Sequence, residues 1–265
     1  CFILCALVSV FVLSILGMAV FGSLIKFWPY NLSLTLGKYN LGALGTAGWD
    51  ALWNSLIMAA LVASLGTIVV FSGAYLVEKT KTWPWARSAL HFGAMIPLAV
   101  PGLVLGLAYI FFFNAPGNPL NGLYHTMTLL VLCTVVHFYT TGHLTAVTAL
   151  KALDAEFESV SASLKVPFYR TFWRVTAPIC TPAMVDISRY FFINAMTTIS
   201  AVVFLYSPDT KVASIAVLNL DEAGDQGPAA AMAVLIAATS LAACIAYLAL
   251  GWLVERKTQT WRNLK

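Results

Sequence analysis

The amino-acid sequence predicts an all-α polytopic membrane protein with about six transmembrane helices. Hydrophobic residues make up 60% of the chain and charged residues only 10%, whereas soluble domains carry about 25% charged residues. Several uninterrupted apolar runs reach the roughly 20 residues that a helix needs to cross the hydrocarbon layer. Because only short polar stretches separate these runs, nearly the whole chain belongs to one membrane unit.

The expected spans follow the apolar runs and the turn signals between them. The sequence "NAPGNPLNG", rich in Gly, Pro and Asn, separates the third span from the fourth. We therefore expect a first helix with an external loop over 1–50, a membrane core over 51–254 and a basic cytoplasmic tail over 255–265. The six spans are expected at residues 1–25, 52–77, 90–113, 127–150, 183–206 and 228–254.

Basic residues are distributed unequally between the two sets of alternate loops, which predicts the orientation of the chain. One set carries only Lys26, Lys38 and Lys211. Because cytoplasmic loops are enriched in Lys and Arg, the more basic set is expected in the cytoplasm. That set holds Lys79, Lys81, Arg87, Lys151, Lys165, Arg170, Arg174, Arg256, Lys257, Arg262 and Lys265.

The third expected span contains residues that disturb a helix. Pro97 and Pro101 remove two backbone donors, so the helix should kink or loosen there. Gly102 and Gly106 form a G-x-x-x-G pair that allows another helix to approach closely. These residues serve either close packing alone or a gating movement of the span.

Several sites are not predicted. His137 and His143 fall on different faces of a helix, and His91 and His125 fall at opposite membrane boundaries, so we expect no metal site. The chain contains no G-x-S-x-G nucleophile elbow and no G-x-x-x-x-G-K-[ST] phosphate loop. We therefore expect no enzymatic activity, no cofactor and no nucleic-acid partner. Any ATP used in transport must be bound by another polypeptide.

The segment 150–179, "LKALDAEFESVSASLKVPFYRTFWRVTAPI", is more polar than its surroundings. Asp154 is a candidate N-cap, and Lys165 places a positive charge where the first short helix should end. Val166 precedes Pro167, and a residue before proline avoids the helical region. A second short helix should begin at Pro167 and end near Pro178 and Pro182. The apolar stripe of the first helix consists of Leu153, Phe157, Val160 and Leu164.

Two interpretations of this helical hairpin follow from the pattern. It either lies in the lipid interface, with aromatic residues among the headgroups, or protrudes and docks into a partner. The segment resembles the cytoplasmic E-A-A loop of ATP-binding-cassette importer permeases. In register, Ser159-Val160-Ser161 takes the E-A-A place, Lys165 the place of a Gly and Pro178 the place of the Pro. This resemblance implies a MetI-like permease fold and contact with an ATPase. The contact residues would be Glu156, Phe157, Glu158, Ser159, Val160, Ser161, Leu164, Lys165 and Pro178.

The resemblance extends along most of the chain. "WNSLIMA" and "MIPLAVPGLVLGLAYIFF" resemble the membrane domain of this superfamily. "FFFNAPGNPLN", "TAVTALKALDAEFESVSASLKVPFYRTFWRV" and "NAMTTISAVVFLYSPDTKVASIAVLNLDEAGD" are similar to 2-aminoethylphosphonate importer permeases. This implies the C-terminal half of a multi-pass permease in the bacterial inner membrane. Its expected partners are cytoplasmic ATPases, a second permease half, an external solute-binding protein and membrane lipid. The implied solute is 2-aminoethylphosphonate; the alternatives are another small anion, ferric iron or, in another class, an ion-coupled secondary transporter.

Polar residues of the fifth expected span are candidates for the translocation path. Asn194, Thr197, Thr198 and Ser200 lie near the middle of the membrane, where polar side chains need a partner or a water-filled cavity. They either line the path or form hydrogen bonds between helices. Asp186 and Arg189, three residues apart, are expected to form a structural ion pair.

Overall fold

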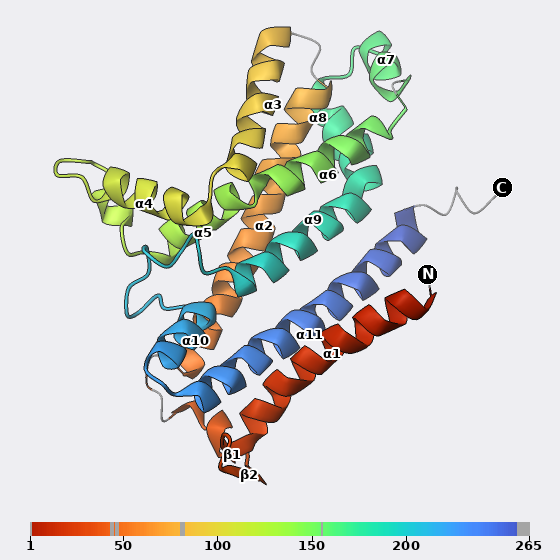
Figure 1. Ribbon diagram of the computed structural model, residues 1–265. Helices are drawn as coiled ribbons and strands as arrows, with labels where there is room; N and C mark the ends of the chain where they lie inside the picture. Colours follow the sequence, from red (N-terminus) through yellow and green to blue (C-terminus); the bar gives the residue numbers. More distant parts are fainter. Residues whose placement is uncertain (1, 43–44, 46–47, 80–82, 155, 259–265) are drawn as a thin grey trace. The chain divides into compact units, whose positions relative to one another are not determined.

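The computed structural model describes residues 2–42, 45, 48–79, 83–154 and 156–258 (Figure 1). Apart from one two-stranded antiparallel hairpin, the regular elements of these residues are helical, as predicted. The chain divides into two compact units. One consists of Cys1–Ile57 with Tyr206–Leu241, and the other of Met58–Leu205 with Ala242–Lys265.

The first unit begins with the apolar helix α1 and contains the small hairpin, which the sequence did not predict. The hydroxyl groups of Ser23 and Tyr39 lie 2.8 Å apart and join the end of α1 to the loop after the hairpin. The elements of this unit are α1 (Phe2–Leu24), β1 (Ile25–Phe27), β2 (Asn31–Leu34), the 3-10 helix Gly37–Tyr39, α10 (Ala213–Glu222) and the first turns of α2 (Trp49–Lys79) and α11 (Gln226–Thr258).

Side chains of α2 tie the start of α10 in place. The buried Ser55 hydroxyl accepts a hydrogen bond of 2.7 Å from the backbone N–H of Ala213. The Asn54 amide donates to the carbonyl oxygens of Asp209 and Lys211 at 2.8 and 3.1 Å. Ser55 thus satisfies one of the N–H groups that the first turn of a helix leaves unpaired.

Ser55→Ala is expected to destabilise the folded chain by about 1–3 kcal/mol, because it leaves the buried N–H of Ala213 without its acceptor. A thermal melt in detergent measures this change. Ser64→Ala is the control, because the Ser64 hydroxyl donates only to carbonyls of its own helix, at 2.8 and 3.2 Å. Equal melting temperatures for the two variants would contradict the assigned role of Ser55.

The second unit holds the rest of α2 and α11 and a bundle of broken helices around them. Its core centres on Phe191, which is fully buried. A Cβ atom added at Gly142 or Gly66 would lie 3.1 or 3.2 Å from the Phe191 ring, so both glycines make room for it. The other elements are α3 (Pro84–Ala99), α4 (Gly102–Phe113), the 3-10 helix Asn121–Leu123, α5 (Met127–His137), α6 (Tyr139–Lys151), α7 (Glu156–Ser163), α8 (Phe168–Thr171), the π-helix Phe172–Thr176 and α9 (Ala177–Thr197).

Fewer helices than predicted qualify as membrane spans. Among the described residues, α1, α2 and α11 are long and apolar enough to cross a membrane, and the count rises to five if each of two bent pairs is one span. The fifth predicted span, 183–206, is wrong in its bounds, because α9 begins at Ala177 and ends at Thr197. Charged and polar residues also interrupt α9, which keeps it out of the set of apolar spans. The side chains of Asp186 and Arg189 within it form the predicted ion pair, at 3.0 Å.

The bent pairs correspond to the third and fourth predicted spans. The chain bends by 109° between α3 and α4 and by 56° between α5 and α6. Val100 is extended, with ψ at 118°, because it precedes Pro101, so the break occurs there. Pro97 is tolerated inside α3. The second break, at Phe138, has no proline and was not predicted.

Candidate functional site

Three interruptions of helix meet in the second unit at Gly102, His137 and Ser200, a place we call the break junction. Gly102 starts α4, His137 ends α5, and Ser200 lies in the non-helical stretch after α9. A Cβ atom added at Gly102 would collide with the Ser200 hydroxyl and lie 3.0 Å from Cε1 of His137. Only glycine therefore fits at this point of contact between the three segments.

The segment that packs against Gly106 of the G-x-x-x-G pair is not a helix, although the sequence led us to expect one there. A Cβ atom at Gly106 would lie 3.0 Å from the carbonyl oxygen of Ala201, in the stretch 198–205. The thiol of Cys133 also donates to this carbonyl, at 3.5 Å. Ala201, Val202 and other residues of the stretch are fully buried. Within a membrane, non-helical backbone is tolerated only where protein buries it or where it lines a cavity.

The candidate residues of the translocation path separate into two groups. The Asn194 amide donates to the carbonyl of Tyr190 at 2.8 Å, and the Thr197 hydroxyl donates to the carbonyl of Ile193 at 3.2 Å, so both bond within α9. Thr198, which is buried, and Ser200 lie beyond the end of α9. Because the helix ends at Thr197, Thr198 does not lie on a helical face with Asn194 and Thr197.

Histidines take part in contacts that the sequence did not predict. The Nδ1 atom of His137 at the break junction is buried and has no hydrogen-bond partner among the described residues. Nδ1 of His91 lies 3.2 Å from Nε2 of His143, and the Thr140 hydroxyl donates to the carbonyl of Ala94 at 2.7 Å. These two contacts tie α3 to α6. Within the described part of the chain, no group of three or more metal-ligating side chains includes them.

The segment 150–179 forms the predicted helix, turn and second helix. Helix α7 covers Glu156–Ser163, and its end has the hydrogen bonds of a Schellman motif, with the Val166 N–H donating to the carbonyl of Ser161 at 2.9 Å. Lys165, which takes the place of the family's Gly, has a φ of +52°. Glycine adopts this conformation without steric cost, which explains why the resembling loops carry it there.

Lys165→Gly is expected to stabilise α7 by up to about 1 kcal/mol, because it removes the strain of a left-handed non-glycine residue. Hydrogen exchange of the amides of 156–163 should then slow by up to about fivefold. Lys151→Gly, in the last turn of α6, is the control. It should have the opposite sign, because glycine weakens a helix. Faster exchange in Lys165→Gly would contradict this account.

A continuous chain of contacts joins α7 to α2. The Ser161 and Thr171 hydroxyl groups are hydrogen-bonded, which ties α7 to the buried last residue of α8. The ring of Phe172 packs on Tyr75 and Phe71 of α2, with centroids 4.7 and 6.1 Å away. The second helix thus braces α7 against a membrane helix.

Two apolar side chains of this segment are exposed, one on α7 and one just after its end. Val160 is 55% exposed and Leu164 70% exposed. A cavity of about 540 Å³ lies between α7 and the second helix, with Arg170 and Arg174 in its wall. The side chains of Glu156, Phe157 and Glu158 lie outside the described set, although their backbone belongs to α7.

The prediction that Pro178 and Pro182 end the second helix is wrong. Helix α8 continues through a π-helix directly into α9, which has Pro178 in its first turn and Pro182 in its interior. Proline is tolerated in the first turn, because the N–H that it lacks would there find no acceptor in a regular α-helix. Pro178 is exposed, and Ser159 is exposed on α7.

Comparison with known proteins agrees with this architecture. An alginate importer solved with its periplasmic protein superimposes with a TM-score of 0.71, covering 93% of this chain and 92% of the importer chain at 14% identity. The fold is therefore that of a MetI-like permease. Residues 82–258 match the model of the family described as "Binding-protein-dependent transport system inner membrane component". The chain belongs to this family: it is a multi-pass inner-membrane transport component and not an enzyme.

Two groups of curated relatives differ in identity and coverage. The ferric transport system permease protein FbpB of Actinobacillus pleuropneumoniae is 32% identical over 225 residues, which cover 84% of this chain and 32% of FbpB. A permease protein of Salmonella paratyphi A named for 2-aminoethylphosphonate transport, PhnV, is 28% identical over 208 residues, 76% of this chain and 74% of PhnV. The chain thus spans about a third of the length of its FbpB relatives.

Proposed function

We propose that the chain is the permease subunit of an ATP-binding-cassette importer that moves a small solute inward. The observation that carries this proposal is the contact chain from the exposed α7, through Ser161, Thr171 and Phe172, to Tyr75 of α2. Through these contacts a docked ATPase could move α2, whereas a flexible loop would not transmit the movement. The exposed Val160 and Leu164 support docking, because the contacts of Thr171 and Phe172 would transmit a partner's movement to α2.

The remaining parts of the importer are proposed from the family. They are two cytoplasmic ATPase subunits that use ATP, a second permease half and an external solute-binding protein. The alginate importer was solved in complex with a periplasmic protein that carries an alginate pentasaccharide, which supports the last of these partners. The break junction and the path candidates Asn194, Thr197, Thr198 and Ser200 would form part of the translocation path.

For the solute, the comparisons support ferric iron more than 2-aminoethylphosphonate. The relatives named for ferric transport are 32–37% identical to this chain, and those named for 2-aminoethylphosphonate transport 27–28%. The expectation of phosphonate transport is therefore the weaker of the two. In such importers the external binding protein selects the solute, so we propose that this chain conducts what that protein delivers.

Uptake in cells that lack this chain tests the function and the solute together. Loss of radiolabelled ferric iron uptake, restored by the intact gene, is the expected result. Loss of 2-aminoethylphosphonate uptake alone would overturn the ferric assignment but keep the importer class. Unchanged uptake of both solutes and of other small anions would contradict the function.

An ion-coupled secondary transporter is the rival class. Proteoliposomes that contain the complete transporter separate the two classes: an importer requires hydrolysable ATP, whereas a secondary transporter works with an ion gradient and no ATP. Uptake that continues with a non-hydrolysable ATP analogue would sink the proposal.

A further inference from the structure

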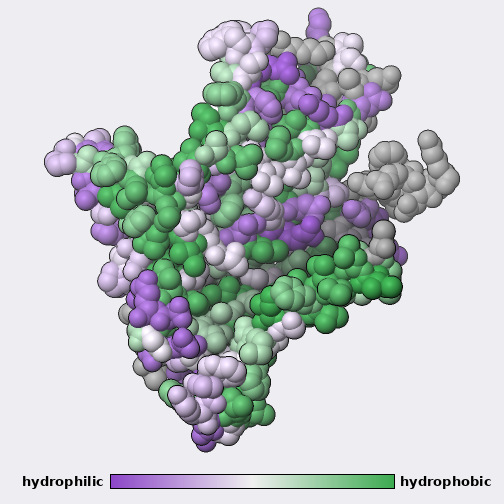
Figure 2. All heavy atoms as spheres, in the orientation of Figure 1, coloured by the Kyte–Doolittle hydropathy of each residue, from purple (hydrophilic) through white to green (hydrophobic). Residues whose placement is uncertain are grey.

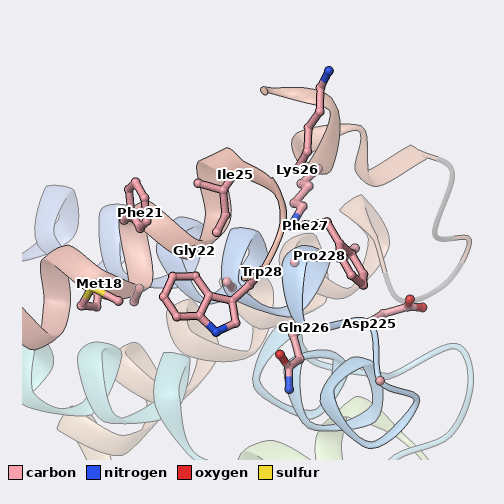
Figure 3. A pocket seen from close by; sticks show the side chains of 15 residues that line it. Met18, Phe21, Gly22, Ile25, Lys26, Phe27, Trp28, Asp225, Gln226 and Pro228 are labelled. Carbon is pink, nitrogen blue, oxygen red and sulfur yellow. The ribbon is translucent and has the colours of Figure 1, made fainter. Parts of the chain in front are cut away.

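A cavity of about 390 Å³ lies in the first unit, between the end of α1, the β-hairpin and the start of α11 (Figure 3). Its volume is within the range of about 300–1,000 Å³ that is usual for small-ligand sites. One part of its wall is apolar and another is polar and positively charged. The lining residues used below are Met18, Phe21, Lys26, Trp28, Lys38 and Gly227.

Lys38 is held against the first turn of α11. Its side chain occupies the place that a Cβ atom at Gly227 would take, so this lysine and this glycine fit each other. The N-terminus of a helix carries a partial positive charge and free N–H groups. An ammonium group in contact with this first turn is electrostatically unfavourable, and an anion that touched both would relieve the repulsion. Among the described residues, neither Lys26 nor Lys38 has an ion-pair partner.

The acidic residue of the cavity wall, Asp225, directly precedes α11 and forms no ion pair with Lys38 in the described part of the chain. In Figure 3 the carboxylate of Asp225 points away from the indole of Trp28, and Lys26 extends outward from the group of labelled side chains. Lys26 is exposed and flexible enough to turn toward a bound molecule, whereas Lys38 is partly buried. The wall therefore combines one fixed and one mobile ammonium group with the N–H groups of α11.

The position of the cavity indicates the source of the anion. Met18 and Phe21 belong to the last two turns of α1, a candidate membrane span whose apolar surface is exposed (Figure 2). The cavity thus opens where a lipid-facing helix leaves the hydrocarbon layer. Trp28 is 55% exposed beside it, and aromatic residues of this kind sit at headgroup depth.

We propose that this cavity binds the headgroup of an anionic phospholipid. Lys38 and the backbone N–H groups of Gln226 and Gly227 hold the phosphate, since the next residue is a proline. Lys26 covers the phosphate from the mouth, and one acyl chain follows Met18 and Phe21 along α1. A phosphate at a helix N-terminus with a lysine beside it is physically favourable. The apolar wall favours a lipid over a free anion, because only a lipid also covers Phe21.

Native mass spectrometry of the purified complete transporter, titrated with phosphatidylglycerol, tests this proposal. Lys38→Gln should weaken lipid retention at least about tenfold, or 1.4 kcal/mol. Gly227→Val should act in the same direction, because its side chain would displace Lys38. Lys211→Gln removes the same charge from another of the expected external loops without touching the cavity, so it should leave retention unchanged. Trp28 fluorescence, measured on the folded transporter, gives a second readout of lipid binding.

Three outcomes would overturn the proposal. Equal retention by Lys38→Gln and Lys211→Gln would show that the lipid binds elsewhere or without selectivity. Soluble glycerol phosphate binding as tightly as phosphatidylglycerol would assign the cavity to a free anion. If Lys38→Gln weakened docking of the solute-binding protein but left lipid retention intact, the cavity would be a protein contact. Transport itself is not the readout, so failure here is distinguishable from failure of the proposed function.

Discussion

Gly102→Ala is expected to reduce solute uptake by up to about thirtyfold, because overpacking costs about 1–3 kcal/mol and about 2 kcal/mol corresponds to that factor. The added Cβ would collide with the Ser200 hydroxyl and press on His137. Three helix interruptions meet there, so the strain would displace the segments that we place on the translocation path. Uptake by a stably expressed complete transporter measures the effect.

A second substitution and a control make this prediction specific. Ser200→Gly removes the atoms that the new Cβ strikes, so the double variant should recover most of the lost uptake. Gly93→Ala is the matched control, because a Cβ at Gly93 meets nothing within 4 Å. Equal losses for Gly93→Ala and Gly102→Ala, or no recovery in the double variant, would show that the break junction has no special role.

Leu164→Ala and Phe157→Ala are each expected to weaken association with the ATPase by about thirtyfold. Small interfaces concentrate their energy in a few anchors that cost about 2 kcal/mol or more when truncated. Leu164 is 70% exposed, so its loss should not harm the folded chain. Co-purification at a series of ATPase concentrations measures the change. Arg256→Ala should have little effect, because Arg256 is exposed and contacts Trp252 of its own helix.

Crosslinking separates docking from a lipid-interface location of α7. Single cysteines in place of Ser159 and Ser163 should crosslink to a co-expressed ATPase in an active complex. Ser161 is less suitable, because its hydroxyl bonds to Thr171 and a cysteine would break the brace. If no position of α7 crosslinks, the docking role is refuted, and the hairpin belongs in the headgroup region.

Packed side chains connect α7 to the break junction, so the predictions for Leu164 and Gly102 are related. Phe172 packs against one end of helix α2, and Gly66 of the same helix leaves space for the Phe191 ring. Phe191 in turn lies on α9, the helix that ends just before Thr198. Movement of α7 can therefore reach the stretch 198–205 through packed side chains within one unit. Leu164→Ala and Gly102→Ala should both reduce transport, but only Leu164→Ala should weaken association with the ATPase.

Local chemistry determined much of this protein from its sequence alone. Apolar runs gave the long helices α1, α2 and α11, and Val166-Pro167 ended α7 where it was expected. Pro101 ended α3, because proline disfavours the helical conformation of the residue before it, here Val100. Each of these features depends on contacts within a few residues, so a linear pattern is sufficient to predict it.

Only the tertiary structure decided the features that join distant segments. The break at Phe138 has no proline, and the end of α9 at Thr197 precedes a sequence that reads as a continuing apolar span. Both depend on how α4, α5 and the stretch 198–205 pack, and no local pattern records that packing. His137, of which the sequence predicted only that it belongs to no metal site, lies at the break junction because the fold brings Gly102 and Ser200 to it. Sequence therefore determined where helices can form, and packing determined where they stop and which residues meet.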